Sequence, residues 1–188
     1  MSTETPVTPP RSMTVEEFLT WHDDNRRRWE LVDGALRAMV IPTSAHSELA
    51  GNVAAVLGSQ LHPPFRFGTE AGLVLPDRDE ILYVADFLIT RVPRSMGERL
   101  FPDPILVGEI LAPGTEVYDR QTKLPDYMSL PSVREIVYLS SSAVEAEVWQ
   151  AADDDWRHER YSGANAVLAL TSVPVHFSLA EVYKGLRF

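Results

Sequence analysis

Two acidic residues interrupt two strongly apolar segments of this 188-residue chain. Asp86 is the one charged residue of the segment Ile81–Ile89, and Glu109 is the one charged residue of Ile105–Leu111. Segments of this kind are typical of strands that are buried on both faces. Because a buried carboxylate is costly unless it is paired or binds a metal ion, two such acids on two core strands predict a shared divalent cation. The alternatives are that each acid lies at a strand end or pairs with an arginine.

Two more residues could complete such a site. Lys123 follows the Glu109 segment on a predicted helix, where its ammonium could orient or deprotonate a water and stabilise developing negative charge. Taken alone, Lys123 would be an ordinary solvated lysine. Glu30 lies in the apolar segment Trp29–Val32, and the two-residue period of a strand puts Glu30 and Val32 on one face. An acid that faces solvent from an edge strand explains Glu30 at least as well.

The remaining candidates are weaker. His46, near the start of a predicted helix, could contact a phosphate or a metal ion, although partly exposed polar residues are common near helix caps. Arg26-Arg27-Arg28 is the one compact basic run, and a solvated turn explains it better than a phosphate contact does. The chain has no HExxH, GxSxG, P-loop or GxGxxG motif. A zinc hydrolase, a serine hydrolase and a nucleotide-binding fold therefore have no support.

The composition limits these interpretations. Acidic residues outnumber basic ones by 27 to 17, which gives a formal net charge of −10. This charge argues against a broad basic surface for gripping nucleic acid, but not against a metal site built from carboxylates. The chain has no cysteine, which excludes a disulfide framework and a thiolate site and fits a cytoplasmic protein. No apolar run is long enough to span a membrane.

The segments around these residues alternate between extended and helical patterns. Residues 1–12 are rich in Thr and Pro and are expected to form a disordered or loosely docked arm, before a single domain over residues 13–188. The expected order begins with a helix from Thr14 to between His22 and Asn25, opened by a capping box of Thr14 and Glu17, then a hairpin with a type I′ turn at Asp33-Gly34, a helix over 45–61, and strands at 65–69, 72–75, 81–90 and 104–111. A helix is expected next, from 115 or 119 to about 130, in which Pro125 causes a kink or a late start. The last expected elements are a strand at 135–139, a hairpin over 145–161 around the acidic turn Asp153-Asp154-Asp155, and a strand with a short helix led by Ser178 over 175–183. This order favours an α/β (α+β) fold, with a mixed sheet flanked by helices, over a regular βαβ repeat.

Several short segments, taken in their order and spacing, resemble those of the Uma-type restriction endonuclease family within the PD-(D/E)xK nuclease superfamily. The likeness extends over about Met13 to Tyr183 and includes His46 at the opening of a helix. The matching segments are Met13–Phe18, Trp29–Gly34, Val84–Asp86, Val107–Pro113, Asp119–Tyr127 and Pro131–Glu135.

The resemblance implies a restriction-endonuclease-like core and assigns a role to each candidate. Asp86 and Glu109 would bind the metal ion, which would be Mg²⁺ or Mn²⁺. Glu30 would be an additional acid from the first hairpin, and Lys123 would be the active-site lysine.

The chain departs from the superfamily pattern at four positions. The superfamily usually places its lysine two residues after the second acid, where this chain has Leu111, so the helix must supply the lysine. Ala85 replaces the usual proline before the first acid, and Gly108 stands where valine is common. Pro125 lies inside the lysine helix and could shift Lys123.

By resemblance, the chain would be a Mg²⁺-dependent endonuclease that hydrolyses DNA phosphodiester bonds. The alternative is a nuclease fold kept as a binding or regulatory module with little or no catalysis, which the net charge and the displaced lysine favour. A homodimer is a further hypothesis, because two symmetric subunits would place two sites on opposite DNA strands. The hairpin Glu145–Tyr161, with Trp149 and Trp156, is the candidate contact.

Overall fold

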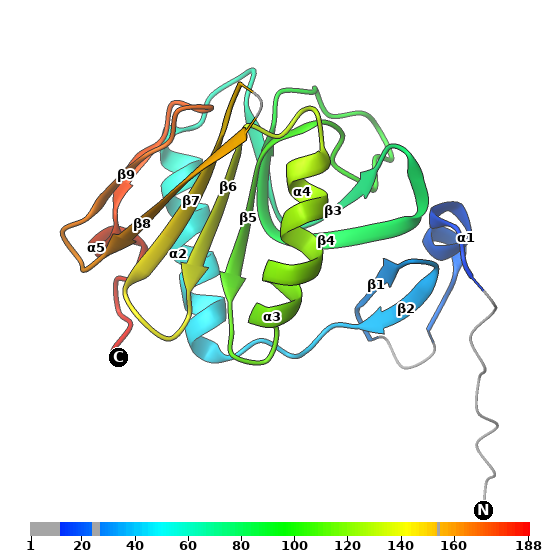
Figure 1. Cartoon of the computed structure of the whole chain (residues 1–188), viewed down its shortest axis with the longest axis horizontal. Helices are drawn as coiled ribbons and strands as arrows, with labels where there is room; N and C mark the ends of the chain where they lie inside the picture. Colours follow the sequence, from blue (N-terminus) through cyan, green and yellow to red (C-terminus); the bar gives the residue numbers. More distant parts are fainter. Residues whose placement is uncertain (1–11, 24–26, 154) are drawn as a thin grey trace, which may run out of the picture. The chain divides into compact units, whose positions relative to one another are not determined.

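The computed structural model describes residues 12–23, 27–153 and 155–188, and Figure 1 shows the course of the chain. Residues 1–11 of the expected arm, Arg26 of the basic run and Asp154 of the acidic turn lie outside the described residues. The described chain divides into two compact units. One contains the residues up to Val40 together with Val74–Tyr83, and the other contains Ile41–Leu73 with Val84–Phe188. The expected single domain over residues 13–188 stays a prediction.

The first unit contains a capped helix and a hairpin. Helix α1 (Val15–Thr20) begins with the expected capping box, in which the Thr14 hydroxyl accepts from the Glu17 N–H and the Glu17 carboxylate accepts from the Thr14 N–H. Strands β1 (Trp29–Val32) and β2 (Ala35–Ala38) pair antiparallel. Asp33 and Gly34 between them have φ angles of 49° and 73°, as the predicted type I′ turn requires. Leu31 of β1 pairs with Leu82 in the first part of β4 (Arg78–Thr90).

The second unit is built on a mixed sheet, as expected from the sequence. The order is β4-β5-β6-β7-β8, with β3 beside β4. Strands β5 and β6 are parallel, and the pairs β4–β5, β6–β7 and β7–β8 are antiparallel. The strands are β3 (Arg66–Leu75), β5 (Pro104–Leu111), β6 (Glu135–Ser140), β7 (Glu145–Ala152) and β8 (Asp155–Ser162).

Helices cover both faces of this sheet (Figure 1). Helix α2 (Ser44–Gln60) lies on one face and buries Leu49, Val53 and Leu57, which recur every four residues along one side of the helix. They join an apolar core that includes Ile89, Leu106, Ile110, Val137, Leu139 and Val148. On the other face lies the crossover between β5 and β6, which consists of α3 (Glu116–Tyr118), the π-helical turn η1 (Asp119–Lys123) and α4 (Leu124–Ser129).

The end of the chain forms a small second sheet and a short helix. Strands β9 (Val167–Ala169) and β10 (His176–Ser178) pair antiparallel. Ser178 and Glu181 form a capping box at the start of α5 (Leu179–Val182), as the sequence predicts. No helix among the described residues is long and apolar enough to cross a membrane.

The expected break between two strands within residues 65–75 was wrong. Strand β3 is continuous where two strands were expected, and the break survives as one residue, Glu70, with a φ angle of 49°. Of the two effects expected from Pro125, the structure shows the late start: Pro125 lies in the first turn of α4, where its missing N–H does no harm. The π turn that precedes α4 was not expected.

The hairpin β7–β8 does not present its tryptophans as an exposed patch. Trp149 is buried, with its ring centroid 4.8 Å from that of Tyr138 and 4.5 Å from that of His158. Most of β8 is polar and exposed, which is typical of an edge strand that avoids pairing with other chains. The homodimer therefore stays a prediction, without an apolar contact at Trp149.

Candidate active site

Asp86 and Glu109 lie just beyond the paired part of β4 and β5. The antiparallel pairing of these strands reaches Phe87 and Gly108 and gives way there to side-chain hydrogen bonds. The backbone N–H of Asp86 donates to Glu109 Oε2 at 3.2 Å, and the N–H of Ile110 donates to Asp86 Oδ2 at 2.7 Å. The two carboxylates therefore lie side by side, between the strands.

Gly108 has a steric reason for being a glycine. A Cβ atom at this position would lie 2.0 Å from Cζ of Phe87, which faces it from β4. The ring of Phe87 fills the space that a valine would need. The glycine at position 108, where valine is common, therefore goes together with the large Phe87 side chain on the neighbouring strand.

Lys123 joins the two acids from the helical crossover. Its Nζ donates to Glu109 Oε1 at 3.0 Å and to the carbonyl oxygen of Val84 at 3.1 Å, and it lies 3.9 Å from Asp119 Oδ1. The side chain is only 6% exposed. The structure therefore brings Lys123 to Glu109 although the strand position two residues after Glu109 holds a leucine.

Tyr127 is a member of this cluster that sequence reasoning missed. Its hydroxyl donates to Glu109 Oε1 at 2.6 Å, and its side chain is fully buried. The sequence signal for Tyr127 was its spacing, because Asp119, Lys123 and Tyr127 follow one another every four residues. In a regular α-helix of 3.6 residues per turn, residues four apart point in slightly different directions. The π turn over Asp119–Lys123 has more residues per turn, which brings these side chains closer to one direction.

His46 reaches the cluster from α2. Its Nε2 lies 3.1 Å from Asp86 Oδ2. Burial alone would lower the pKa of His46, but the hydrogen bond to Asp86 and the negative charges of Asp86, Asp119 and Glu70 outweigh burial and raise the pKa. A protonated His46 would place positive charge beside Asp86, where a phosphate could accept from it.

Burial raises the pKa of Glu109 to about 8, and the charges of Asp86 and Asp119 act in the same direction. The positive charge of Lys123 and the hydrogen bond from Tyr127 offset part of this effect. Glu109 therefore tends to hold a proton at neutral pH in the cation-free protein. A divalent cation near Asp86 and Glu109 would stabilise the ionised form of Glu109.

The donor atoms fit a hard cation that keeps part of its water shell. Asp86 and Glu109 offer carboxylate oxygens, and Mg²⁺ usually takes one or two carboxylates, several waters and substrate phosphate oxygens. Among the residues that the structure describes, no group of three or more His, Asp or Glu side chains is arranged to hold a metal ion.

Glu30 lies in the first unit. It is 1% exposed on β1, and its Oε2 is 3.4 Å from Nη1 of Arg37 on β2, its register partner. It therefore does not face solvent. Its role as an additional acid of the site stays a prediction.

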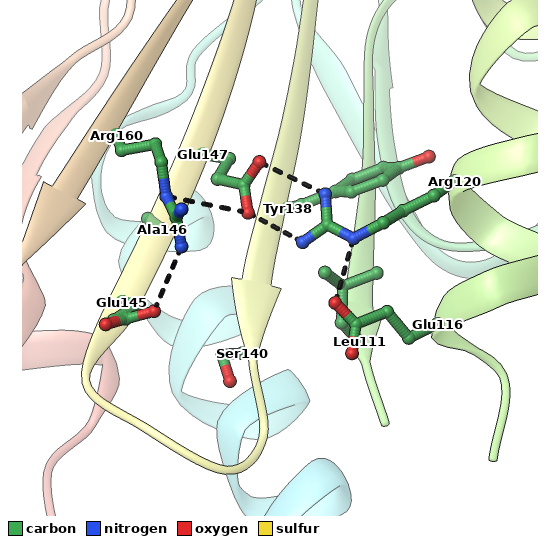
Figure 2. Close-up of a pocket in the computed structure, with 9 residues that line it drawn as sticks. All are labelled: Leu111, Glu116, Arg120, Tyr138, Ser140, Glu145, Ala146, Glu147 and Arg160. Carbon is green, nitrogen blue, oxygen red and sulfur yellow. Dashed lines mark hydrogen bonds and ion pairs between the residues drawn. The ribbon is translucent and has the colours of Figure 1, made fainter. Parts of the chain in front are cut away.

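A charged network continues along the same face of the sheet (Figure 2). Glu109, Tyr138, Glu147 and Arg160 occupy register-matched positions on successive strands. Arg120 of η1 donates to both Glu147 oxygens at 2.6 and 3.1 Å.

Other contacts surround this arginine. Arg120 also donates to Glu116 at 2.8 Å and lies over the ring of Tyr138, beside a cavity of about 210 Å³. Sequence reasoning did not single out Arg120. Arg120, three residues before Lys123, connects η1 to β7 through its hydrogen bonds to Glu147.

Known proteins resemble this chain in sequence and in fold. The chain is 28% identical over 191 residues to the "Uncharacterized protein slr1290" of Synechocystis sp., and the match covers all of both chains. Its fold is similar to a crystal structure from Anabaena variabilis, described as a "putative nuclease belonging to DUF820", with a TM-score of 0.73 at 17% identity over 91% of this chain and 97% of the other. That likeness confirms the expected nuclease-like fold. The Uma2 family model, described as "Putative restriction endonuclease", matches residues 15–181, so the chain belongs to the Uma2 family.

Proposed function

We propose that this protein is a Mg²⁺-dependent endonuclease that hydrolyses DNA phosphodiester bonds. The proposal rests on the close approach of Asp86, Glu109 and Lys123, which come from three separate elements of the fold. Asp86 and Glu109 lie between β4 and β5, and Lys123 comes from η1 to within 3.0 Å of Glu109. Membership of the Uma2 family supports the same reaction class.

Each side chain has a role that follows from its position. Asp86 and Glu109 would hold the cation, and Mn²⁺ would serve in place of Mg²⁺. When bound, the cation would polarise the scissile phosphate and lower the pKa of a bound water. Lys123 would orient the attacking water and offset charge that develops on the phosphate. His46 would donate to a phosphate oxygen, and Glu30 is proposed as the additional acid.

The test is the nicking of supercoiled DNA in Mn²⁺. Glu109→Gln is expected to reduce the rate on the order of 100-fold or more, because it removes a cation ligand. Glu48→Gln is the matched control, since Glu48 is an exposed acid on α2. Equal rates for the wild type and Glu109→Gln, or no cleavage of supercoiled, linear and single-stranded DNA by either, would refute the proposal.

A second candidate function is a nuclease fold that binds without cutting. It is favoured by the net charge of −10 and by the engagement of Lys123 with both Glu109 and the Val84 carbonyl. Calorimetric titration with Mn²⁺ separates the two candidates. Binding that disappears in Asp86→Asn supports the endonuclease, and a wild type that binds no Mn²⁺ supports the binding module.

A further inference from the structure

An open cavity of about 230 Å³ lies beside Asp86, between α2 and strands β3 and β4 of the second unit. Its lining includes His46, Ala50, Gly51 and Ala54 from α2, Glu70 from β3 and Asp86 from β4. The cavity therefore opens on the side of Asp86 where His46 approaches, and it shares two residues with the candidate active site.

The wall formed by α2 is made of small residues. Ala54 lies three positions after Gly51 and four after Ala50, so it neighbours both on the surface of the helix, and all three line the cavity. A Cβ atom on Gly51 would have nothing within 4 Å. The small residues on this side of α2 therefore border open space, whereas Leu49, Val53 and Leu57 pack against the core.

The size of the cavity indicates what it can hold. It is much larger than the ~30 Å³ that a water occupies in the liquid, and it is smaller than the ~300–1,000 Å³ pockets that enclose drug-sized ligands. One sugar with its base is a group of this scale, whereas a duplex is far too large to enter.

The acids of the lining favour an uncharged group inside the cavity and leave the phosphate beside Asp86, where the proposed cation would offset the negative charge. Glu70 and Asp86 line the cavity, so a phosphate inside it would be repelled. His46, another lining residue, has its Nε2 3.1 Å from Asp86 Oδ2, and an N–H on its other ring nitrogen could donate to a phosphate oxygen. Along a nucleic-acid strand, the group next to a phosphate is an uncharged nucleoside.

We propose that the cavity holds the sugar and base of one nucleotide next to the scissile phosphate, and that the substrate is therefore single-stranded or unpaired at the point of cleavage. This inference rests on the proposed function, because the phosphate is placed at Asp86 and His46. A base in a cavity of this size cannot stay paired with its partner. The net charge of −10 also argues against a broad positive surface that would hold a duplex by its backbone.

The test compares two leucine substitutions on the same helix. Gly51 lines the cavity, so Gly51→Leu is designed to narrow it, whereas Ala55→Leu changes an exposed position outside the lining. Leucine is a good helix former, so both variants are expected to melt at or above the wild-type temperature. Binding of a fluorescent oligonucleotide is measured in Ca²⁺ by anisotropy, with a gel to check that the oligonucleotide stays intact.

The wild type is expected to bind the single strand about tenfold or more tightly than the same sequence as a duplex. Gly51→Leu is expected to lose that preference, and Ala55→Leu is expected to keep it. Equal affinity of the wild type for both forms, no binding of either form, or wild-type affinity in Gly51→Leu would overturn the inference.

Cleavage assays in Mn²⁺ separate this inference from the proposed function. If Gly51→Leu cleaves single strands with the wild-type KM, the cavity inference fails and the endonuclease stands. If the wild type cleaves nothing, but its preference for single strands disappears in Gly51→Leu, the endonuclease fails and the cavity stands as a binding site.

Discussion

Asp86 and Glu109 are connected through each other's strands: Glu109 accepts from the backbone N–H of Asp86, and Asp86 accepts from the N–H of Ile110, the residue after Glu109. Two carboxylates repel each other, but here each one accepts a hydrogen bond from a backbone N–H of the other's strand, which holds them close together. The arrangement fixes both acids where β4 and β5 stop pairing. Five predictions follow from the residues around this pair.

Lys123→Met is expected to lower the nicking rate on the order of 100-fold or more, because it removes the ammonium that would orient water and offset charge. Mn²⁺ binding is expected to persist, since both carboxylates remain. Lys184, the other lysine of the chain, is exposed and makes Lys184→Met the matched control. Nicking at the wild-type rate by Lys123→Met would assign Lys123 a purely structural role.

The stability of the cation-free protein is expected to fall as the pH rises from about 4.5 to about 8. Glu109 has a pKa raised from 4.5 to about 8 in the folded protein. Over this range the folded state holds a proton that the unfolded state has lost, so the free energy of unfolding decreases with pH. Urea denaturation across the range measures this slope. Glu109→Gln should flatten it, and saturating Mn²⁺ should oppose it, since the cation binds the ionised form.

Tyr127→Phe is expected to destabilise the fold by roughly 1–3 kcal/mol, because it removes a buried hydrogen bond to a carboxylate. That bond lowers the pKa of Glu109, so its loss should move Mn²⁺ binding to higher pH. Tyr161→Phe is the control, since Tyr161 donates to Glu159 at 2.7 Å on the surface. An unchanged pH profile of Mn²⁺ binding in Tyr127→Phe would mean that the hydroxyl does not tune Glu109.

Arg120→Gln is expected to raise KM little and lower kcat, because it loosens the segment that carries Lys123. The guanidinium is 31% exposed, so solvent screening limits the loss of unfolding free energy to roughly 1 kcal/mol. Arg160→Gln, at a more exposed partner of Glu147, should leave kcat unchanged. A loss of stability in Arg120→Gln without any change in kcat would confine the Arg120–Glu147 pair to a structural role.

Gly108→Val is expected to destabilise the protein by roughly 1–3 kcal/mol or more through overlap with Phe87. Phe87→Ala, although destabilising alone, should relieve part of this cost in the double variant, and a double-mutant cycle measures the coupling. Gly114→Ala is the control, because a Cβ there meets nothing within 4 Å. Strict additivity of Gly108→Val and Phe87→Ala would contradict the steric explanation.

The sequence predicted the sheet and its helices because their patterns are local. The hairpin turn at Asp33-Gly34 and the apolar stripe of α2 each depend on residues that are close in the chain. The π turn was missed because Pro125 indicates only that an α-helix cannot continue unchanged, not how the backbone adjusts before it.

The candidate site was harder to predict because a lone acid in an apolar strand has more than one explanation. Glu135 begins an apolar strand and is as buried as Glu109. It is satisfied by N–H and hydroxyl groups of Thr171 and Ser172, at 2.5 to 3.0 Å, and by Gln150. A buried structural carboxylate and a site carboxylate differ in their hydrogen-bond partners. Those partners come from distant parts of the chain, so the sequence around the acid does not reveal them.

The π turn also determines where the chain can change length. One residue more or fewer between Asp119 and Pro125 would rotate everything before it by roughly 100° relative to α4. A length change directly after Lys123 would therefore turn Lys123 and Arg120 away from Glu109 and Glu147. Insertions and deletions in this short segment should therefore abolish function in a protein that still folds, whereas exposed loops such as residues 91–103 should tolerate them.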